Sequence, residues 1–248
     1  MRVFVGPNKD AHTHQPTPDD VRLLADAQVL VFSGAHFEPW LAELIRSSRT
    51  KAKLIDLSKA VSLRRLEGPH GEIDPHYWND ARNAQSAIPA LRAALAEVFP
   101  DQTDDFSKRE QAYLIRLREL DEWVRSSVEK VPVSQRKLVT AHDSIGYWAD
   151  AYGFDVVGTA FGALTTEAAD PSARQIKDLV DVIRAQNVKS IFAENFGNPG
   201  LIQRVARDAG VRLAPPLYTD ALGPPGGPAS SYMELIRYNT RTIVESLK

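Results

Sequence analysis

The chain has 248 residues, of which 43% are hydrophobic and 25% charged, a composition typical of a globular protein large enough for two modest cores. Its formal net charge of −2 leaves no basic excess for binding nucleic acid or an anionic membrane surface. Cysteine is absent, which excludes disulfides and thiolate metal sites, and no run approaches the roughly 20 apolar residues of a membrane-spanning helix.

The first part of the chain alternates short apolar runs with helix-like segments. The predicted elements are, in order, a strand over Arg2–Val5, a helix starting at Thr17–Pro18, a strand over Val29–Phe32, a helix over Phe37–Ile45 and a strand over Lys53–Leu57. This alternation predicts an α/β lobe with a parallel sheet, in which ligands bind at the carboxyl ends of the strands. The polar loop that contains His12 and His14 follows the first predicted strand, so we expect it at such an end.

A charged, irregular stretch over Val61–Ile73 follows, and we predict a mobile surface loop there. It contains His70 and leads into Asp74-Pro75-His76-Tyr77-Trp78-Asn79-Asp80. Aromatic residues follow His76 directly, which predicts a half-buried histidine. An amphipathic helix is predicted over Ala84–Val98.

A long helix is predicted over Thr103–Val131, ended by Pro132. Its apolar residues recur at helical spacing and predict one buried stripe: Phe106, Tyr113, Leu117, Leu120, Val124 and Val128. Such a helix spans roughly 35–40 Å, the width of a small domain. We therefore predict an N-terminal lobe over residues 1–103, a linker helix over 104–131 and a C-terminal lobe over 132–248.

The C-terminal lobe repeats the alternation of strands and helices. The predicted elements are a strand over Lys137–Ala141 that runs into His142, a helix that ends at Gly153, a strand over Asp155–Gly158, a helix capped by Asp170–Pro171, a strand over Ser190–Ala193 that ends at Glu194, a helix over Leu201–Asp208, a short strand before Asp220, and a helix over Ser230–Leu247. The predicted fold class is therefore α/β, with two lobes that each hold a small parallel sheet flanked by helices and are joined by one long linker helix.

A metal site is the chemistry that the histidines indicate as a set, although a single histidine at a strand end is more often structural. Three of them have an acidic residue close by in the sequence: His12 with Asp10, His76 with Asp74, and His142 with Asp143. A metal-bound imidazole usually donates its second nitrogen to such an acceptor. Three neutral imidazoles and one carboxylate form a site that Zn²⁺ accepts, and the residues alone leave Asp220 and Glu194 open as the fourth ligand.

Several motifs, in order, resemble those of the zinc/manganese ABC-transporter periplasmic solute-binding proteins of the helical-backbone type. The segment Val5–Pro18 is similar to that family's opening pattern G-x-x-x-D-x-H-x-x-x-P-T-P. The other similar segments are Asp74–Asp80, Thr140–Asp143 with Tyr147, Ile191–Glu194, Leu217–Asp220 and Tyr232–Asn239. The likeness extends from residue 3 almost to the end of the chain.

The resemblance implies a protein that is not an enzyme. It implies a metal held between two lobes by His12 and His76 from the first and by His142 and Asp220 from the second. It places Glu194 near the metal rather than on it, and we expect Asp10, Asp74 and Asp143 behind the ligands in the same way. The implied function is capture of Zn²⁺ and its delivery to an ABC-transporter permease, by a monomer that is periplasmic or associated with the outer side of a membrane. A metallochaperone is a further candidate partner, and nucleic acid is not.

The chain departs from the family pattern at a few positions. His14 stands where an aromatic residue is common, Ala81 where proline is frequent, and Ser144 where alanine is frequent. Family members also carry a secretion signal, a strand and a helix before the strand at Val3. We therefore expect that the N-terminal lobe of this chain lacks its first strand and helix.

Two alternatives remain open. A member of the same family specific for Mn²⁺ or Fe²⁺ is one, although His142 as third ligand favours zinc, since a second carboxylate would favour the harder Mn²⁺. A mononuclear metallohydrolase is the other, because His12-Thr13-His14 is an H-x-H pair after a predicted strand. Against the hydrolase, the chain has no H-E-x-x-H motif, and four protein ligands leave little room for a catalytic water.

Overall fold

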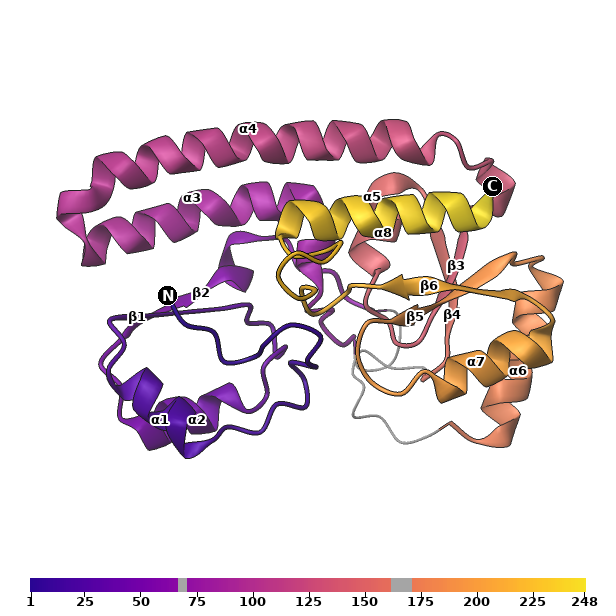
Figure 1. The fold of residues 1–248 in the computed structure, drawn as a ribbon, viewed down its shortest axis with the longest axis horizontal. Coiled ribbons are helices and arrows are strands. Elements are labelled where there is room, and N and C mark those ends of the chain that lie inside the picture. Colours follow the sequence, from indigo (N-terminus) through magenta and orange to yellow (C-terminus); the bar gives the residue numbers. More distant parts are fainter. Residues whose placement is uncertain (67–70, 162–170) are drawn as a thin grey trace. The chain divides into compact units, whose positions relative to one another are not determined.

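The computed structural model describes residues 1–66, 71–161 and 171–248. The chain forms two compact units: unit 1 comprises Met1–Val5 and Ala11–Asp121, and unit 2 comprises Gly6–Asp10 and Glu122–Lys248. Each is an α/β lobe with small parallel sheets flanked by helices, and the long helix α4 (Thr103–Val128) continues from unit 1 into unit 2 (Figure 1). The predicted fold class is confirmed.

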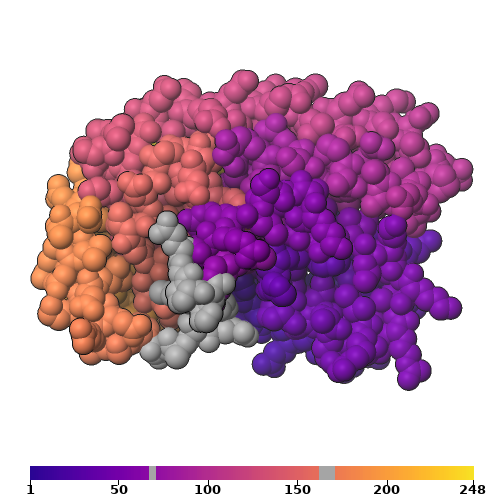
Figure 2. All heavy atoms as spheres, turned by 180° about the vertical axis from the view of Figure 1, so that it is seen from behind, coloured from indigo at the N-terminus to yellow at the C-terminus, as the bar shows by residue number. Residues whose placement is uncertain are grey.

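Unit 1 is built on two parallel strands, β1 (Val29–Phe32) and β2 (Lys53–Asp56), with Val29 opposite Lys53 and Phe32 opposite Asp56. Helices α1 (Pro18–Ala25) and α2 (Leu41–Ser48) lie on one side of the strands, and α3 (Ala81–Val98) lies on the other (Figure 1). The core between the strands and the first two helices consists of Leu24, Leu30, Leu41 and Leu44. Figure 2 shows this unit from behind, with the magenta side chains of α3 and α4 along one side.

The N-terminal residues differ from expectation. The predicted strand at Arg2–Val5 is wrong, because β1 and β2 pair only with each other in the described sheet and these residues lie in irregular structure. Phe4 instead packs edge-on against Trp40, with ring centroids 6.1 Å apart. The predicted helix start at Thr17–Pro18 is confirmed, since the Thr17 hydroxyl accepts from the Asp20 N–H and the Asp20 carboxylate accepts from the Thr17 N–H.

Helix α4 confirms most of the predicted stripe. Leu117, Leu120 and Val124 have 0% exposure, whereas Phe106 near the start is half-buried and packs against Phe99. The helix ends at Val128 rather than at Val131. Pro132 has no N–H to donate to the Val128 carbonyl oxygen, and the Arg136 guanidinium donates to the carbonyl oxygens of Val128 and Val131 instead.

Unit 2 contains two parallel pairs, β3 (Lys137–Thr140) with β4 (Asp155–Thr159) and β5 (Ser190–Glu194) with β6 (Arg212–Leu217), and β3 lies beside β5. Helices α6 (Ala173–Ala185) and α7 (Gly200–Ala209) lie on one side, and α5 (Gly146–Tyr152) and α8 (Tyr232–Leu247) on the other (Figure 1). The core under α6 and α7 is aliphatic and includes Ile176, Ile183, Ile191, Ile202 and Val205. Four short 3₁₀ helices complete the described elements: η1 (Leu57–Ala60), η2 (Tyr77–Asn79), η3 (Pro100–Gln102) and η4 (Val133–Gln135).

Two predicted helix ends in unit 2 have different outcomes. Gly153 ends α5 in the left-handed region with φ of 75°, as predicted. The predicted cap of α6 at Asp170–Pro171 is wrong, because Ser172 caps this helix in a reciprocal pair of hydrogen bonds with Gln175. Asp170 and His70 lie outside the described residues, as does part of the predicted surface loop. Within the described part of the chain, no helix is long and apolar enough to cross a membrane.

A pair of glycine substitutions tests the close contact under the turn that precedes α2. Gly34 and Gly226 have similar φ angles of 77° and 78°. A Cβ at Gly34 would lie 2.0 Å from Asp56 Oδ1, whereas one at Gly226 would meet nothing within 4 Å. We expect Gly34→Ala to lower the free energy of unfolding by about 2–4 kcal/mol, the cost of left-handed strain and overpacking together, and Gly226→Ala by about 1 kcal/mol. Urea unfolding of both variants measures this, and equal losses would contradict the contact.

Candidate metal centre

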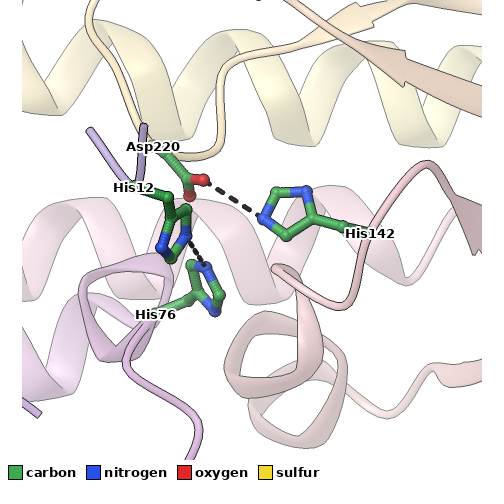
Figure 3. Close-up of side chains that lie close together, drawn as sticks. All are labelled: His12, His76, His142 and Asp220. Atoms are coloured by element: carbon green, nitrogen blue, oxygen red, sulfur yellow. Dashed lines mark hydrogen bonds and ion pairs between the residues drawn. The ribbon is translucent and has the colours of Figure 1, made fainter. Parts of the chain in front are cut away.

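Two histidines meet in unit 1. His12 lies in the loop before α1 and His76 directly before η2, and they are 4% and 0% exposed. Their Nε2 atoms are 3.3 Å apart, as the dashed line in Figure 3 marks. Because two lone pairs at this distance would repel each other, one ring carries a hydrogen between them in the metal-free protein.

The second nitrogen of His76 is held by a buried carboxylate. His76 Nδ1 lies 2.8 Å from Asp74 Oδ1, which also accepts from the His76 backbone N–H at 3.0 Å. The other carboxylate oxygen, Oδ2, accepts from Arg64 Nη1 at 3.0 Å, so the buried charge of Asp74 is compensated. A hydrogen on Nδ1 leaves the Nε2 lone pair for the position that faces His12. His12 is then the ring that donates in the metal-free state.

Aromatic side chains surround this pair. The buried Phe37 ring packs edge-on against His12 at 4.6 Å and against His76 at 5.9 Å, and Trp78 lies 5.5 Å from His76. Trp40 Nε1 donates to the carbonyl oxygen of Ala11 at 2.7 Å and so fixes the backbone next to His12. The two rings are therefore oriented from several sides and shielded from water.

Unit 2 supplies a histidine between two carboxylates. His142 follows β3, and its Nδ1 lies 2.7 Å from Glu194 Oε1. Its Nε2 lies 3.1 Å from Asp220 Oδ2 (Figure 3). Ser144 Oγ donates to the same Glu194 oxygen at 3.0 Å. Burial opposes a charge on the ring, but Glu194 and Asp220 together outweigh burial and raise the pKa of His142 well above its ordinary value.

Both pairs have the spacing of ligands on a tetrahedral metal. Zinc–nitrogen and zinc–oxygen bonds of about 2.0–2.1 Å at the tetrahedral angle place neighbouring ligand atoms about 3.3 Å apart. The His12–His76 pair is at 3.3 Å, and the His142–Asp220 pair is at 3.1 Å. In each unit, a divalent cation could therefore replace the hydrogen between the two facing atoms with little movement of the side chains.

The remaining residues singled out from the sequence have different surroundings. His14 Nε2 lies 3.4 Å from Asp20 at the start of α1, and its ring packs against Trp40 at 4.6 Å. Asp10 and Asp143 are half-buried, and their place behind the ligands stays a prediction. The hydrogen bond from Ser144 to Glu194 is a feature that sequence reasoning missed, although the departure from the frequent alanine was a signal, because alanine cannot donate.

Comparison with known proteins identifies the family. Residues 1–246 match the family described as the periplasmic component A of the zinc-uptake complex. The chain belongs to this family. It is 31% identical to the manganese-binding lipoprotein MntA of Halalkalibacterium halodurans, over 96% of this chain and 78% of that protein. It is also 31% identical to the zinc-binding protein TroA of Treponema pallidum, over 100% of this chain and 81% of that protein.

A solved structure agrees with the fold. The periplasmic zinc-binding protein TroA from Treponema pallidum superposes with a TM-score of 0.90 at 28% identity, covering 98% of this chain and 89% of that one. The chain is thus a metal-binding solute-binding component of an ABC transporter, a family that acts with permease and ATPase components. It is not an enzyme, which removes the metallohydrolase alternative. The metal itself differs among relatives, which include an iron-binding protein, YfeA of Yersinia pestis, at 28% identity.

Removing the Glu194 charge tests the electrostatics of His142 in the metal-free protein. Glu194 raises the pKa of His142, so we expect Glu194→Gln to lower that pKa, measured by NMR titration of the His142 ring. A raised folded-state pKa gives stability that is fully present below the unfolded value of about 6.5 and is lost as pH rises through the folded value. The melting temperature of wild type minus that of Glu194→Gln should therefore be larger at pH 6 than at alkaline pH. Glu97→Gln, an exposed change in unit 1, is the control. An unchanged titration would refute this account.

Proposed function

We propose that this protein captures one Zn²⁺ ion with His12, His76, His142 and Asp220 and delivers it to its permease. The observation that carries the proposal is the match between two buried ligand pairs and the edge of a zinc tetrahedron, at 3.3 and 3.1 Å. His76 and His142 each have Nδ1 against a carboxylate, which leaves Nε2 as the ligand atom. Two pairs of facing atoms supply the four ligands that one four-coordinate cation needs.

The donor set supports zinc over manganese. Glu194 is engaged by the Nδ1 atom of His142 and by Ser144, so it is not needed as a metal ligand. Three imidazole nitrogens and one carboxylate oxygen remain, a nitrogen-rich set that suits Zn²⁺ better than the harder Mn²⁺. The name of the relative MntA, a manganese-binding lipoprotein, makes Mn²⁺ the second candidate, and the iron-binding relative YfeA keeps Fe²⁺ as a third.

Metal analysis tests the proposal directly. Protein purified without added metal is assayed by elemental mass spectrometry and titrated against a chromophoric chelator with Zn²⁺ or Mn²⁺. We expect about one zinc ion per chain and weaker binding of manganese. Tighter binding of Mn²⁺ or Fe²⁺ would reassign the cargo, and the absence of near-equimolar binding would refute the site.

The place of action follows from the same family. Relatives are named as periplasmic or lipoprotein components, so we propose a location in the periplasm or on the outer face of a membrane. We propose that the protein works as a monomer, and a metallochaperone as loading partner stays a prediction. Light scattering of the purified protein tests the oligomeric state.

Two histidine substitutions distinguish a proposed metal ligand, His76, from a nearby histidine that is not one, His14. We expect His76→Ala to weaken zinc binding by more than about 100-fold, because loss of a ligand exceeds the 10–100-fold effect of losing a ligand's hydrogen-bond partner. His14→Ala should weaken binding by less than about threefold, since His14 lies against Asp20 and Trp40. Chelator competition measures both values, and equal losses would show that the wrong histidine of the first loop is assigned.

Acid should remove the stabilisation that zinc provides. Each ligating imidazole must be neutral, and the raised pKa of His142 in the metal-free protein means that protons compete with the cation even near neutral pH. The protonated His142 also stabilises the metal-free protein at acid pH. The difference in stability between the zinc-loaded and the metal-free protein therefore becomes smaller still. We expect the zinc-dependent rise in melting temperature to be large at pH 7.5 and to shrink steeply towards pH 5. Bound ligand at a thousandfold excess over Kd contributes about 4 kcal/mol.

The measurement is a pair of melting curves, metal-free and zinc-loaded, at each pH. Asp220→Asn keeps the shape of that side chain but removes its charge, so its gain should be smaller at every pH. A wild-type gain that stays constant from pH 7.5 to pH 5 would contradict a site rich in histidine.

A further inference from the structure

The short segment Gly6–Asp10 belongs to unit 2, although the residues on both sides of it belong to unit 1. His12 lies two residues after the end of this segment in the chain. Whatever holds Gly6–Asp10 in unit 2 therefore also restrains the backbone that leads to a proposed ligand in unit 1.

Asn8 makes two hydrogen bonds between the segment and the rest of unit 2. Its backbone N–H donates to the carbonyl oxygen of Leu222 at 3.0 Å, and its side-chain Oδ1 accepts from Asn195 Nδ2 at 2.9 Å. Asn8 has φ of 54°, in the left-handed region that asparagine tolerates better than most residues. Leu222 belongs to the loop that carries Asp220, so Asn8 is bonded to the loop of one proposed ligand and precedes another.

Asn195 connects the Asp220 loop to the end of β5. Its backbone N–H donates to Leu217 at the end of β6, and its side-chain Nδ2 lies 3.5 Å from the carbonyl oxygen of Ala221, next to Asp220. Asn195 directly follows Glu194, whose carboxylate holds His142. Glu194 and Asn195 are thus neighbours in the chain. The side chain of Glu194 contacts His142, and the side chain of Asn195 contacts the Asp220 loop.

We propose that Asn8 and Asn195 are a positioning pair that ties the Asp220 loop to the chain segment leading into His12. This inference rests on the proposed zinc site and deepens it. The pair lowers the conformational freedom that His12 and Asp220 lose when they bind one cation, so it favours assembly of the site and slows release. Neither Asn8 nor Asn195 contacts the metal-facing atoms of the proposed ligands. The pair therefore acts only by positioning the backbone that carries His12 and Asp220.

Substitutions at Asn8 distinguish the side-chain bond from the backbone conformation. Asn8→Gly keeps the left-handed φ and the N–H bond to Leu222 but loses the acceptor for Asn195. Asn8→Asp keeps both the tolerance of positive φ and an acceptor oxygen. We expect Asn8→Gly to release zinc about three- to tenfold faster, the effect of losing one net hydrogen bond, and Asn8→Asp to stay within about twofold of wild type. Release is followed by stopped-flow mixing of the zinc-loaded full chain with excess chelator.

A double-substitution cycle tests whether the two asparagines act together. Asn195→Ala should also speed release, and the Asn8→Gly/Asn195→Ala variant should be no faster than Asn195→Ala alone, because both remove the same bond. The matched control is Asn198→Ala in the same β5–α7 connection, whose side chain accepts from the Gly200 N–H and has no bond to the segment. Its release rate should equal that of wild type.

The outcomes separate this inference from the proposed function. If wild-type protein binds zinc, His142→Ala abolishes binding and Asn8→Gly releases zinc at the wild-type rate, the positioning pair is wrong while the site stands. Additive effects of Asn8→Gly and Asn195→Ala overturn the pairing as well. If wild type itself binds no zinc, the proposed site fails and the positioning role fails with it. Hydrogen exchange of the Asn8 amide, faster in Asn195→Ala than in Asn198→Ala, checks that the segment is loosened in variants that remain folded.

Discussion

The arrangement depends on one interaction made twice, a buried imidazole whose Nδ1 atom faces a carboxylate. Asp74 does this for His76 and Glu194 does it for His142. The bond selects the tautomer, fixes the ring and leaves Nε2 as the outward-facing atom. A buried carboxylate is costly unless it is compensated, which explains why Arg64 reaches Asp74 and why Ser144 reaches Glu194. The loops at the strand ends are thus shaped by the needs of two carboxylates that bind no metal in the proposed site.

The two ligand pairs differ in charge. In unit 1, the charge of Asp74 is compensated by Arg64, and both facing residues, His12 and His76, are imidazoles without a carboxylate of their own. In unit 2, Glu194 and Asp220 flank a single imidazole, which leaves a net negative charge even when His142 is protonated. A divalent cation restores neutrality when it replaces that proton, so the unit 2 pair has the stronger electrostatic attraction for the cargo. The raised pKa of His142 and the preference for a cation have the same cause.

The sequence pattern predicted the features that depend on neighbouring residues, such as helix faces and caps. Features that depend on residues far apart in the chain could not be predicted in this way. The stripe on α4 and the capped start at Thr17 were visible because each depends on neighbours within one or two helical turns. The strand expected at Arg2–Val5 was not formed, since a strand needs a partner that local sequence does not reveal. Asp74 could be assigned to His76 from its position two residues away. Glu194 lies 52 residues after His142 in the chain, and only the family resemblance indicated its role. The Asn8–Asn195 bond joins still more distant residues and had no sequence signal.

The ligands of the proposed cation come from both units of the chain. Each unit supplies two ligands, and two ligands alone form a weak site, so tight binding requires contributions from both. The linkage that makes this possible is covalent, through α4 and through the crossings of the chain on either side of Gly6–Asp10. A second ligand pair attached to the same chain binds at a high effective concentration, and stiffer attachments raise that concentration further. Restraint of Gly6–Asp10 by Asn8 therefore strengthens binding without adding a ligand.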